Sequence, residues 1–400
     1  MVIDFEKLRA ILLENGMHPT RAKNMSDLIR QDMANWPELY ADKQKREWAF
    51  ERGFVPGCIG LYGKAFNEQT YRDYWCDYDY FMAYPLNNHF IIWINDKLTL
   101  KYMLNTPELS RYMPEYYLYI ENDGHYTYLM DSPEHIKKDA DYLLNLLKDK
   151  KILAFKPNRG SGGSGFSFLQ YENGKLYRDR KQITMEEYEQ FKSSINGYIV
   201  TEFIHQSDEM EKIYPTIASA FRIILYKKIQ HDPYAEPDYG CLLGYARFAT
   251  NKNRAASNND QGGLAVTIDW ENGVYKGGFR GLKEFWGDVD DVEEKGFERH
   301  PDTGVALNGE RIPNWDEVKK GLIDICRHMS SLDYFGMDVI LTNDGFKICE
   351  INSSPSVGRG QHLYGKCCLD NEDAINFAKS KKRPCKKSFI ECIREATIED

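Results

Sequence analysis

The feature that most restricts the fold of this chain is a glycine-rich run between two short apolar segments. Residues 152–155 are Ile-Leu-Ala-Phe, and residues 160–165 are Gly-Ser-Gly-Gly-Ser-Gly. The first, third and sixth positions of this run match a dinucleotide-binding fingerprint, but that fingerprint has to open a helix. Residues 166–169, Phe-Ser-Phe-Leu, and the turn Asn173-Gly174 predict a strand and a hairpin instead. The run therefore joins two strands, and a Rossmann site is excluded.

The loop between these strands is suited to hold phosphates. The P-loop signature, which ends in Gly-Lys-Ser or Gly-Lys-Thr, is absent from the sequence, and so are the catalytic signatures of protein kinases. Backbone N–H groups without side-chain bulk can close over phosphate oxygens, and Lys156 on the incoming strand offers a positive charge. A flexible surface turn is the alternative interpretation of the same glycines.

Composition and charge narrow the class of protein. A length of 400 residues predicts roughly two to three domains, and 42% hydrophobic with 28% charged residues is typical of a globular chain. A net charge of −9 argues against nucleic acid as a partner. Residues 1–7 carry charges where an export signal needs an apolar run, and no segment approaches the roughly 18 apolar residues of a membrane span. We expect a cytoplasmic protein without an integral membrane segment; the sequence indicates no oligomeric state.

Hydrophobic periodicity changes from helical to strand-like near residue 150. Apolar residues at helical spacing predict a helix over 5–12, and the aromatic stretch 71–84 is expected to be buried core. Ser132 as N-cap predicts an amphipathic helix over 133–147. Short strands and hairpins follow, interrupted by a helix that begins with a capping box at 184–187. The pattern is that of an α+β protein.

A second group of polar residues lies in a predicted hairpin over 335–352. Its first strand carries Asp338, and its second strand carries Glu350 and Asn352. If residues 343–345 form a three-residue loop, the two carboxylates face each other and the amide lies on the same face; a two-residue loop would separate them. Such hard oxygen ligands suit Mg²⁺ or Mn²⁺ bridging substrate phosphates. A solvated polar sheet face is the alternative.

Taken together, the order and spacing of these motifs over residues 95–360 resemble the ATP-grasp superfamily. The resemblance implies two α+β subdomains that sandwich ATP, with a helical N-terminal region. Lys97 is similar to the family's lysine that reaches the ATP phosphates, and Lys156 with the glycine-rich loop is similar to its second lysine and phosphate lid. The loop residues concerned are Gly160, Ser161, Gly162 and Gly163.

The same resemblance implies an adenine site and a metal site. The segment from Tyr198 to Ile204 looks like the family's interdomain hinge, where Glu202 and the backbone of Phe203 and Ile204 would meet adenine. Glu209 falls where the family carries a ribose-binding carboxylate. The acid, glutamate and asparagine of the family's Mg²⁺ (or Mn²⁺) site correspond to Asp338, Glu350 and Asn352.

The resemblance divides the chain into five segments. They are a helical, aromatic-rich region (1–85), a segment before the nucleotide domain (86–150), a lid subdomain (151–203), a catalytic subdomain (204–365) and a basic tail (366–400). Residues 220–223, 247–248 and 258–263 most resemble the sugar-transfer-associated ATP-grasp subgroup, found with polysaccharide biosynthesis.

These residues favour phosphoryl transfer, in which charge neutralisation and positioning do most of the work. We expect an ADP-forming carboxylate–amine ligase that acts through an acyl phosphate on a small-molecule carboxylate and an amine or glycan precursor. The alternatives are an ATP-grasp kinase acting on a small-molecule or sugar hydroxyl, and a nucleotide-binding module without turnover. Arginine forks suit carboxylates and oxyanions, and the candidates are Arg222, Arg247 and Arg254. Arg222, in an apolar strand, is either functional or paired with a structural acid.

Overall fold

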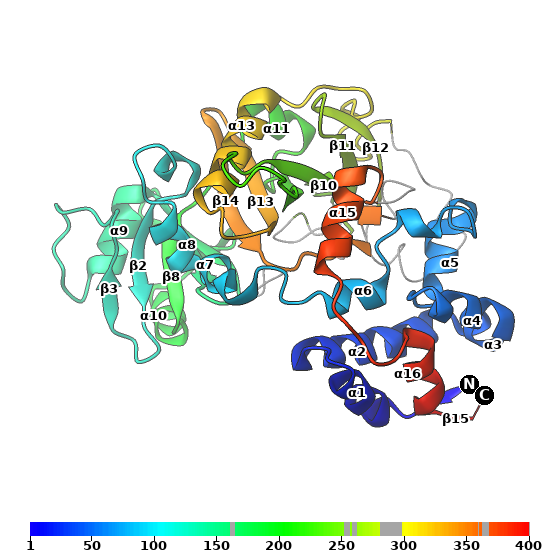
Figure 1. Cartoon of the computed structure of the whole chain (residues 1–400). Helices are drawn as coiled ribbons and strands as arrows, with labels where there is room; N and C mark the ends of the chain where they lie inside the picture. Colours follow the sequence, from blue (N-terminus) through cyan, green and yellow to red (C-terminus); the bar gives the residue numbers. More distant parts are fainter. Residues whose placement is uncertain are drawn as a thin grey trace.

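The computed structural model describes residues 1–160, 165–251, 257, 262–280, 298–358, 360–361 and 368–399. It is 38% helical and 24% strand, which confirms the α+β class. Figure 1 shows a smaller sheet with helices beside it, a larger central sheet, and a helical bundle that contains both termini.

The smaller sheet has seven antiparallel strands in the order β3-β2-β8-β4-β5-β6-β7. Leu153 and Phe155 of β4 pack in one core with helices α9 and α10. Because side chains alternate along a strand, Lys156 lies on the opposite face. The elements are β2 (Tyr116–Ile120), β3 (Tyr126–Tyr128), α9 (Tyr142–Lys150), β4 (Ile152–Pro157), β5 (Ser167–Glu172), β6 (Lys175–Arg178), β7 (Lys181–Ile183), α10 (Met185–Ser194) and β8 (Tyr198–Glu202). The sheet thus takes strands from both sides of residue 150, and the predicted capping box of α10 is confirmed.

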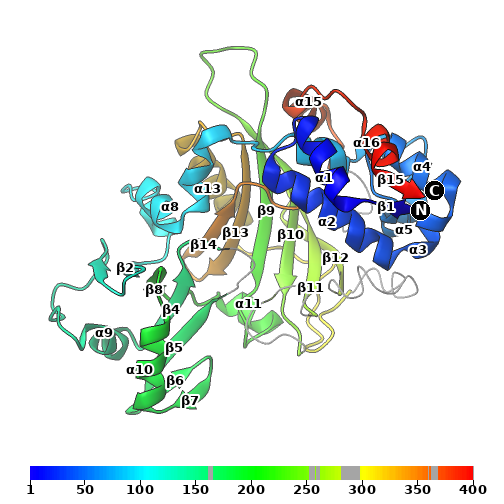
Figure 2. The same ribbon diagram turned by 90° about the horizontal axis from the view of Figure 1, so that it is seen from below.

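The larger sheet has six antiparallel strands in the order β12-β11-β10-β9-β13-β14, seen side by side in Figure 2. Phe221 and Ile223 of β9 pack in one core with Val318 and Leu322 of helix α13. Arg222, which alternates with them, therefore lies on the face away from α13. The elements are β9 (Ala220–Lys227), β10 (Tyr239–Phe248), β11 (Leu264–Asp269), β12 (Val274–Arg280), β13 (Tyr334–Thr342) and β14 (Gly345–Asn352), with α11 (Asp208–Ile213) and α13 (Trp315–His328) on the covered face.

The β13–β14 hairpin differs from the predicted one. Thr342 pairs with Gly345, so the loop has two residues and not three. The register then shifts between Asp338 and Val339, because a β-bulge at Cys349 adds one residue to β14. The bulge restores the pairing that the shorter loop would have lost, and Asp338 lies directly opposite Glu350.

The N-terminal helices fold together with the C-terminal segment. Leu8 and Leu12 of α1 share a core with Phe389 and Ile393 of α16, and β1 pairs with β15. Both termini consequently lie side by side in Figure 1. The elements are β1 (Val2–Ile3), α1 (Phe5–Glu14), α2 (Pro19–Asn35), α3 (Pro37–Ala41), α4 (Lys43–Glu51), α5 (Gly57–Tyr62), α6 (Asp77–Met82), α16 (Phe389–Ala396) and β15 (Thr397–Glu399). The predicted helix over 5–12 is confirmed.

Shorter helices connect the bundle to the two sheets. They are α7 (Ile92–Asn95), α8 (Lys97–Met103) and α15 (Glu372–Lys381). The aromatic stretch 71–84 is core as predicted: Tyr74, Trp75, Tyr78 and Tyr80 are all buried.

The predicted helix over 133–147 is wrong in its first half, since α9 begins only at Tyr142. The Ser132 hydroxyl donates to the carbonyl of Tyr117 and caps no helix. Asp131 accepts from the backbone of Tyr116 and forms an ion pair with Lys101. These contacts to a neighbouring strand and helix hold the segment in turns, and they outweigh a local pattern of apolar residues.

A buried acid in the helical bundle makes stability depend on pH. Asp32, 1% exposed, accepts from Tyr40 and from the backbone of Gly57. Burial raises the pKa of Asp32 from 3.8 to about 7. Between pH 3.8 and about pH 7 the unfolded chain loses this proton more readily than the folded one. Each rise of one pH unit in this range therefore lowers the free energy of unfolding by ~1.4 kcal/mol.

We therefore expect the stability advantage of wild type over Asp32→Asn to be about 2 kcal/mol larger at pH 5 than at pH 7. Urea unfolding of both proteins at the two pH values measures this difference, and titration of other groups cancels in the comparison. A stability difference that does not change with pH would contradict the raised pKa.

Candidate active site

Lys97 joins three parts of the molecule at the junction of the two sheets. It opens helix α8, whose N-cap Asp96 accepts from the backbone of Thr99. Its Nζ donates to the carbonyl of Gly160 at 3.0 Å and lies 3.9 Å from a carboxylate oxygen of Glu350. Burial lowers the pKa of Lys97, which Glu350 partly offsets. The structure thus brings together a predicted phosphate lysine, the start of the glycine-rich loop and a predicted metal ligand.

Two further residues hold the start of this loop. Asn158 donates to Asp96 at 2.9 Å and accepts from the backbone of Leu98, and Arg159 donates to the same Asp96 carboxylate at 3.1 Å. Burial acts to raise the pKa of Asp96, but hydrogen bonds from Thr99 and Arg159 overcome it and lower the pKa. Sequence reasoning missed Asn158 and Arg159, although their place directly before the glycines was a usable signal.

Arg222 and Arg247 converge on Asp338. Arg222 donates to both Asp338 oxygens through Nε and a terminal nitrogen, the latter bond being 2.7 Å long, and Arg247 lies 3.1 Å from one of them. Neighbouring strands place them, since Arg222 pairs with Asp338 across β9 and β13. Burial acts to raise the pKa of Asp338, but attraction from Arg222 and then Arg247 lowers it from 3.8 to about 2. Arg222 is therefore paired with the predicted metal acid itself.

Glu350 stands beside this cluster in a different electrostatic state. Burial, and then the charge of Asp338, raise the pKa of Glu350. Asn352 donates to Glu350 at 3.2 Å and to the carbonyl of Gly336 at 3.4 Å. Both of these bonds use Nδ2, so the amide oxygen of Asn352 is available to coordinate a cation. A divalent cation would offset the cost of the buried Glu350 charge.

The donor set fits a nucleotide with one divalent cation. Lys97, Lys156, Arg222 and Arg247 supply four positive side chains against the two carboxylates, and such an excess suits a polyphosphate. Among the described residues no three His, Cys, Asp or Glu side chains form a metal site by themselves. Two carboxylates and an amide oxygen, completed by phosphate oxygens, are nevertheless typical of Mg²⁺.

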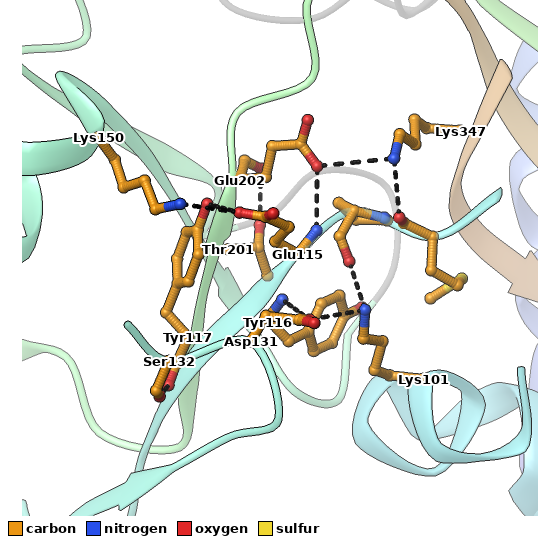
Figure 3. Close-up of polar contacts among 12 residues, drawn as sticks. Lys101, Glu115, Tyr116, Tyr117, Asp131, Ser132, Lys150, Thr201, Glu202 and Lys347 are labelled. Carbon is orange, nitrogen blue, oxygen red and sulfur yellow. Dashed lines mark hydrogen bonds and ion pairs between the residues drawn. The ribbon is translucent and has the colours of Figure 1, made fainter. Parts of the chain in front are cut away.

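The predicted hinge links the two sheets through the side chain of Glu202 (Figure 3). Its carboxylate accepts from the backbone of Glu115 at 3.0 Å and lies 3.8 Å from Lys347 of β14. Lys347 in turn donates to the carbonyl of Met113 at 3.1 Å. This carboxylate therefore fixes the chain segment that passes between the sheets, a role that the sequence did not reveal.

The remaining predicted site residues differ in their surroundings. Phe203 packs its ring against Phe168 of β5, and Ile204 is buried. Glu209 is exposed in the first turn of α11. Four predicted site residues lie outside the described residues: Ser161, Gly162, Gly163 and Arg254.

The family is identified by a model for sugar-transfer associated ATP-grasp proteins, which matches residues 80–376. The chain belongs to the sugar-transfer associated ATP-grasp family, and its fold is the ATP-grasp fold expected from the motifs. No curated protein matches the sequence. Among the described helices, none has the length and apolar character needed to span a membrane.

The solved structures to which this chain is similar share little sequence with it. The ATP-grasp ligase PsnB in complex with a minimal precursor is 10% identical with a TM-score of 0.35, over 74% of this chain and 63% of that chain. D-alanine–D-alanine ligase from Bacillus anthracis is 10% identical with a TM-score of 0.33, over 78% and 71%. The biotin carboxylase domain of 2-oxoglutarate carboxylase from Hydrogenobacter thermophilus is 12% identical with a TM-score of 0.37, over 75% and 48%. The chain thus spans less than two thirds of PsnB.

Proposed function

We propose that this protein is an ADP-forming carboxylate–amine ligase that uses ATP and Mg²⁺ or Mn²⁺ and acts on a glycan precursor or related small molecule. The observation that carries the proposal is the position of Lys97 between the Gly160 carbonyl and Glu350. One cation there reaches both a loop suited to phosphates and a carboxylate suited to a metal, which is the charge arrangement that phosphoryl transfer requires.

In this proposal the nucleotide lies between the two sheets. Lys156 and Lys97 hold the phosphates, and the main chain after Glu202 meets the base. Asp338, Glu350 and Asn352 hold the metal, which when bound neutralises charge on the transferring phosphoryl group. The side-chain contacts around Asp338 keep its carboxylate ionised at neutral pH, as its pKa of about 2 indicates.

The arginines have a further part in the proposed reaction. A substrate carboxylate attacks the γ-phosphorus to give an acyl phosphate and ADP, and an amine then displaces phosphate through a tetrahedral intermediate. Arg222 and Arg247 lie on the same sheet face as Glu350, and their planar guanidinium groups suit both the carboxylate and the oxyanion. Asp338 would hold them in place between turnovers.

The test is ADP release with ATP and Mg²⁺ in the presence of pooled sugar acids, amino acids and amines. The ligase should release ADP, and not AMP, only when a carboxylate and an amine are both present. Hydroxylamine should trap the acyl phosphate as a hydroxamate. ADP release with a hydroxyl compound alone, and no hydroxamate, would replace the ligase with the kinase. Nucleotide binding without turnover across the panel would favour a binding module.

In calorimetric titration with ATP and Mg²⁺, Lys156→Ala should weaken ATP binding by at least ~10-fold, because a charge that contacts phosphate contributes on the order of 1.5 kcal/mol. Lys175→Ala, an exposed lysine of the same sheet, is the matched control. Equal ATP affinity of the Lys156 variant and wild type would remove Lys156 from the phosphate site.

A further inference from the structure

A cavity of ≈ 190 Å³ lies between the helical bundle and the loop that follows the metal-site strand. Helices α2, α5 and α6 supply one wall, and Ser354, Ser356, Val357 and Gly358 supply the other. This loop leaves β14 directly after Asn352, so one wall of the cavity continues in sequence from the strand that carries Glu350 and Asn352. Its size gives room for several non-hydrogen atoms.

One residue of the cavity lining, Tyr80, is influenced by the charge of Arg222. Tyr80 is buried and donates its hydroxyl to the carbonyl of Pro355 in the loop. Burial raises the pKa of Tyr80 to about 12, an effect that the charges of Arg21 and Arg222 oppose. Arg222 is thus close enough to act electrostatically on Tyr80 in this wall.

Two carboxylates line the cavity on the bundle side. Asp32 is 1% exposed, and its Oδ2 accepts from both Tyr40 and Gly57. Its Oδ1 is buried and has no hydrogen-bond partner in the described part of the chain. Asp77 accepts from the backbone of Val55 at 3.0 Å, and its charge acts on Asp32. A buried carboxylate with an unpaired oxygen is costly, and a positively charged ligand beside the carboxylate would offset that cost.

One positive side chain, Arg21, lines the same cavity. Its guanidinium lies over the ring of Tyr84 at 4.4 Å and that of Phe81 at 5.7 Å. Two carboxylates against one arginine leave an excess of negative charge when both acids are ionised. The remaining wall is largely apolar, with Leu28, Val55 and Leu61. An occupant with a positively charged donor and a short apolar or polar body matches this lining.

We propose that this cavity binds the amine co-substrate of the ligase, a small primary amine held as its ammonium ion by Asp32 and Asp77. The role of the amine as a co-substrate rests on the proposed function, but binding of the amine can be measured without turnover. Asp32 and Asp77 act here as binding residues whose carboxylates pair with the ammonium.

The test is calorimetric titration of the full chain at pH 8, where both acids are ionised and simple amines are protonated. The probes are ethanolamine and n-propylamine, with ethylene glycol and n-propanol as neutral counterparts of similar size. We expect saturable binding of the amines and none of the alcohols. Asp32→Asn should weaken amine binding at least ~10-fold, because it removes the charge that pairs with the ammonium.

Two more variants keep the test independent of folding. Ser356→Trp places a large ring at an exposed position of the cavity lining and should abolish amine binding without loss of stability. Asp27→Asn, on the same helix as Asp32 but exposed and paired with Lys23, is the matched control and should bind as wild type does.

Three results would overturn the proposal: alcohols that bind as tightly as the amines, amine affinity unchanged in both the Asp32 and the Ser356 variants, or no saturable amine binding up to about 100 mM. Titration of ATP with Mg²⁺ into the same samples separates this proposal from the ligase. If wild type binds the nucleotide but no amine, only the cavity assignment is wrong. If wild type binds no nucleotide, the proposed function itself is wrong.

Discussion

Replacing Arg222 with alanine should destabilise the protein by about 3 kcal/mol, because it leaves the buried Asp338 carboxylate without its bidentate partner. Asp338 has only 6% of its side chain exposed, and Arg222 engages both of its oxygens. Breaking such a pair from one side costs about 3–5 kcal/mol, and Arg247, which still contacts Asp338, holds the loss near the lower value. Urea unfolding at pH 7 measures it.

The matched control is Arg394→Ala, which removes two exposed ion pairs at 3.6 and 3.9 Å to Glu47 and Glu51. We expect a change below about 1 kcal/mol there. A double variant, Arg222→Met with Asp338→Leu, should recover part of the lost stability and yet remain inactive, since it removes the Asp338 charge together with that of Arg222 but also takes one partner from Arg247. If Arg222→Ala unfolds at the wild-type urea concentration, the ion pair contributes nothing and its role is confined to substrate.

Glu350→Gln should leave the stability of the fold nearly unchanged and reduce activity at least ~100-fold. Burial and the charge of Asp338 raise the pKa of Glu350, so its ionised form is unfavourable in the folded protein. An uncharged amide of the same shape removes this cost and keeps the hydrogen bond with Asn352. It also removes one of the two carboxylates that would hold the metal.

ADP release at increasing Mg²⁺ concentration and thermal unfolding are the two measurements for this variant. Glu186→Gln, an exposed position in α10, controls for the substitution itself. Wild-type turnover in Glu350→Gln with the usual Mg²⁺ dependence would remove Glu350 from the metal site. A large fall in unfolding temperature would instead assign it a structural role.

The pairing of Asp338 with Glu350 was predicted from the sequence, but for a reason that the structure corrects. The sequence makes this pairing conditional on a three-residue loop, whereas a two-residue loop and a β-bulge at Cys349 together give the same register. Bulges arise from strand twist and neighbouring contacts, which a turn motif does not report. The same limit explains the wrong helix start after Ser132, where contacts to Tyr117 and Lys101 come from distant parts of the chain.

The motifs that could be predicted are those in which chemistry and local sequence coincide. Gly160 and Glu350 belong to short segments whose residue types already indicate phosphate and metal binding, Lys97 is implied by the family resemblance, and the fold places the three together. The cavity with Asp32 could not be predicted, since its walls come from residues more than 300 positions apart in the chain, and nothing near Asp32 in sequence marks it as buried. Burial of a polar side chain is a property of the folded chain and not of a local pattern.

The union of the first and last helices has a consequence for synthesis of the protein. The core of the bundle needs Phe389 and Ile393 of α16, which are made only after both sheets. At about 5–20 residues per second, ribosomes need about 20–80 s to go from α1 to α16. For that time the apolar faces of the first helices have no final partner, so the part of the chain that is translated first completes its fold last. During this interval the nascent chain would require a chaperone. Slow translation of the last part of the mRNA would lengthen the interval.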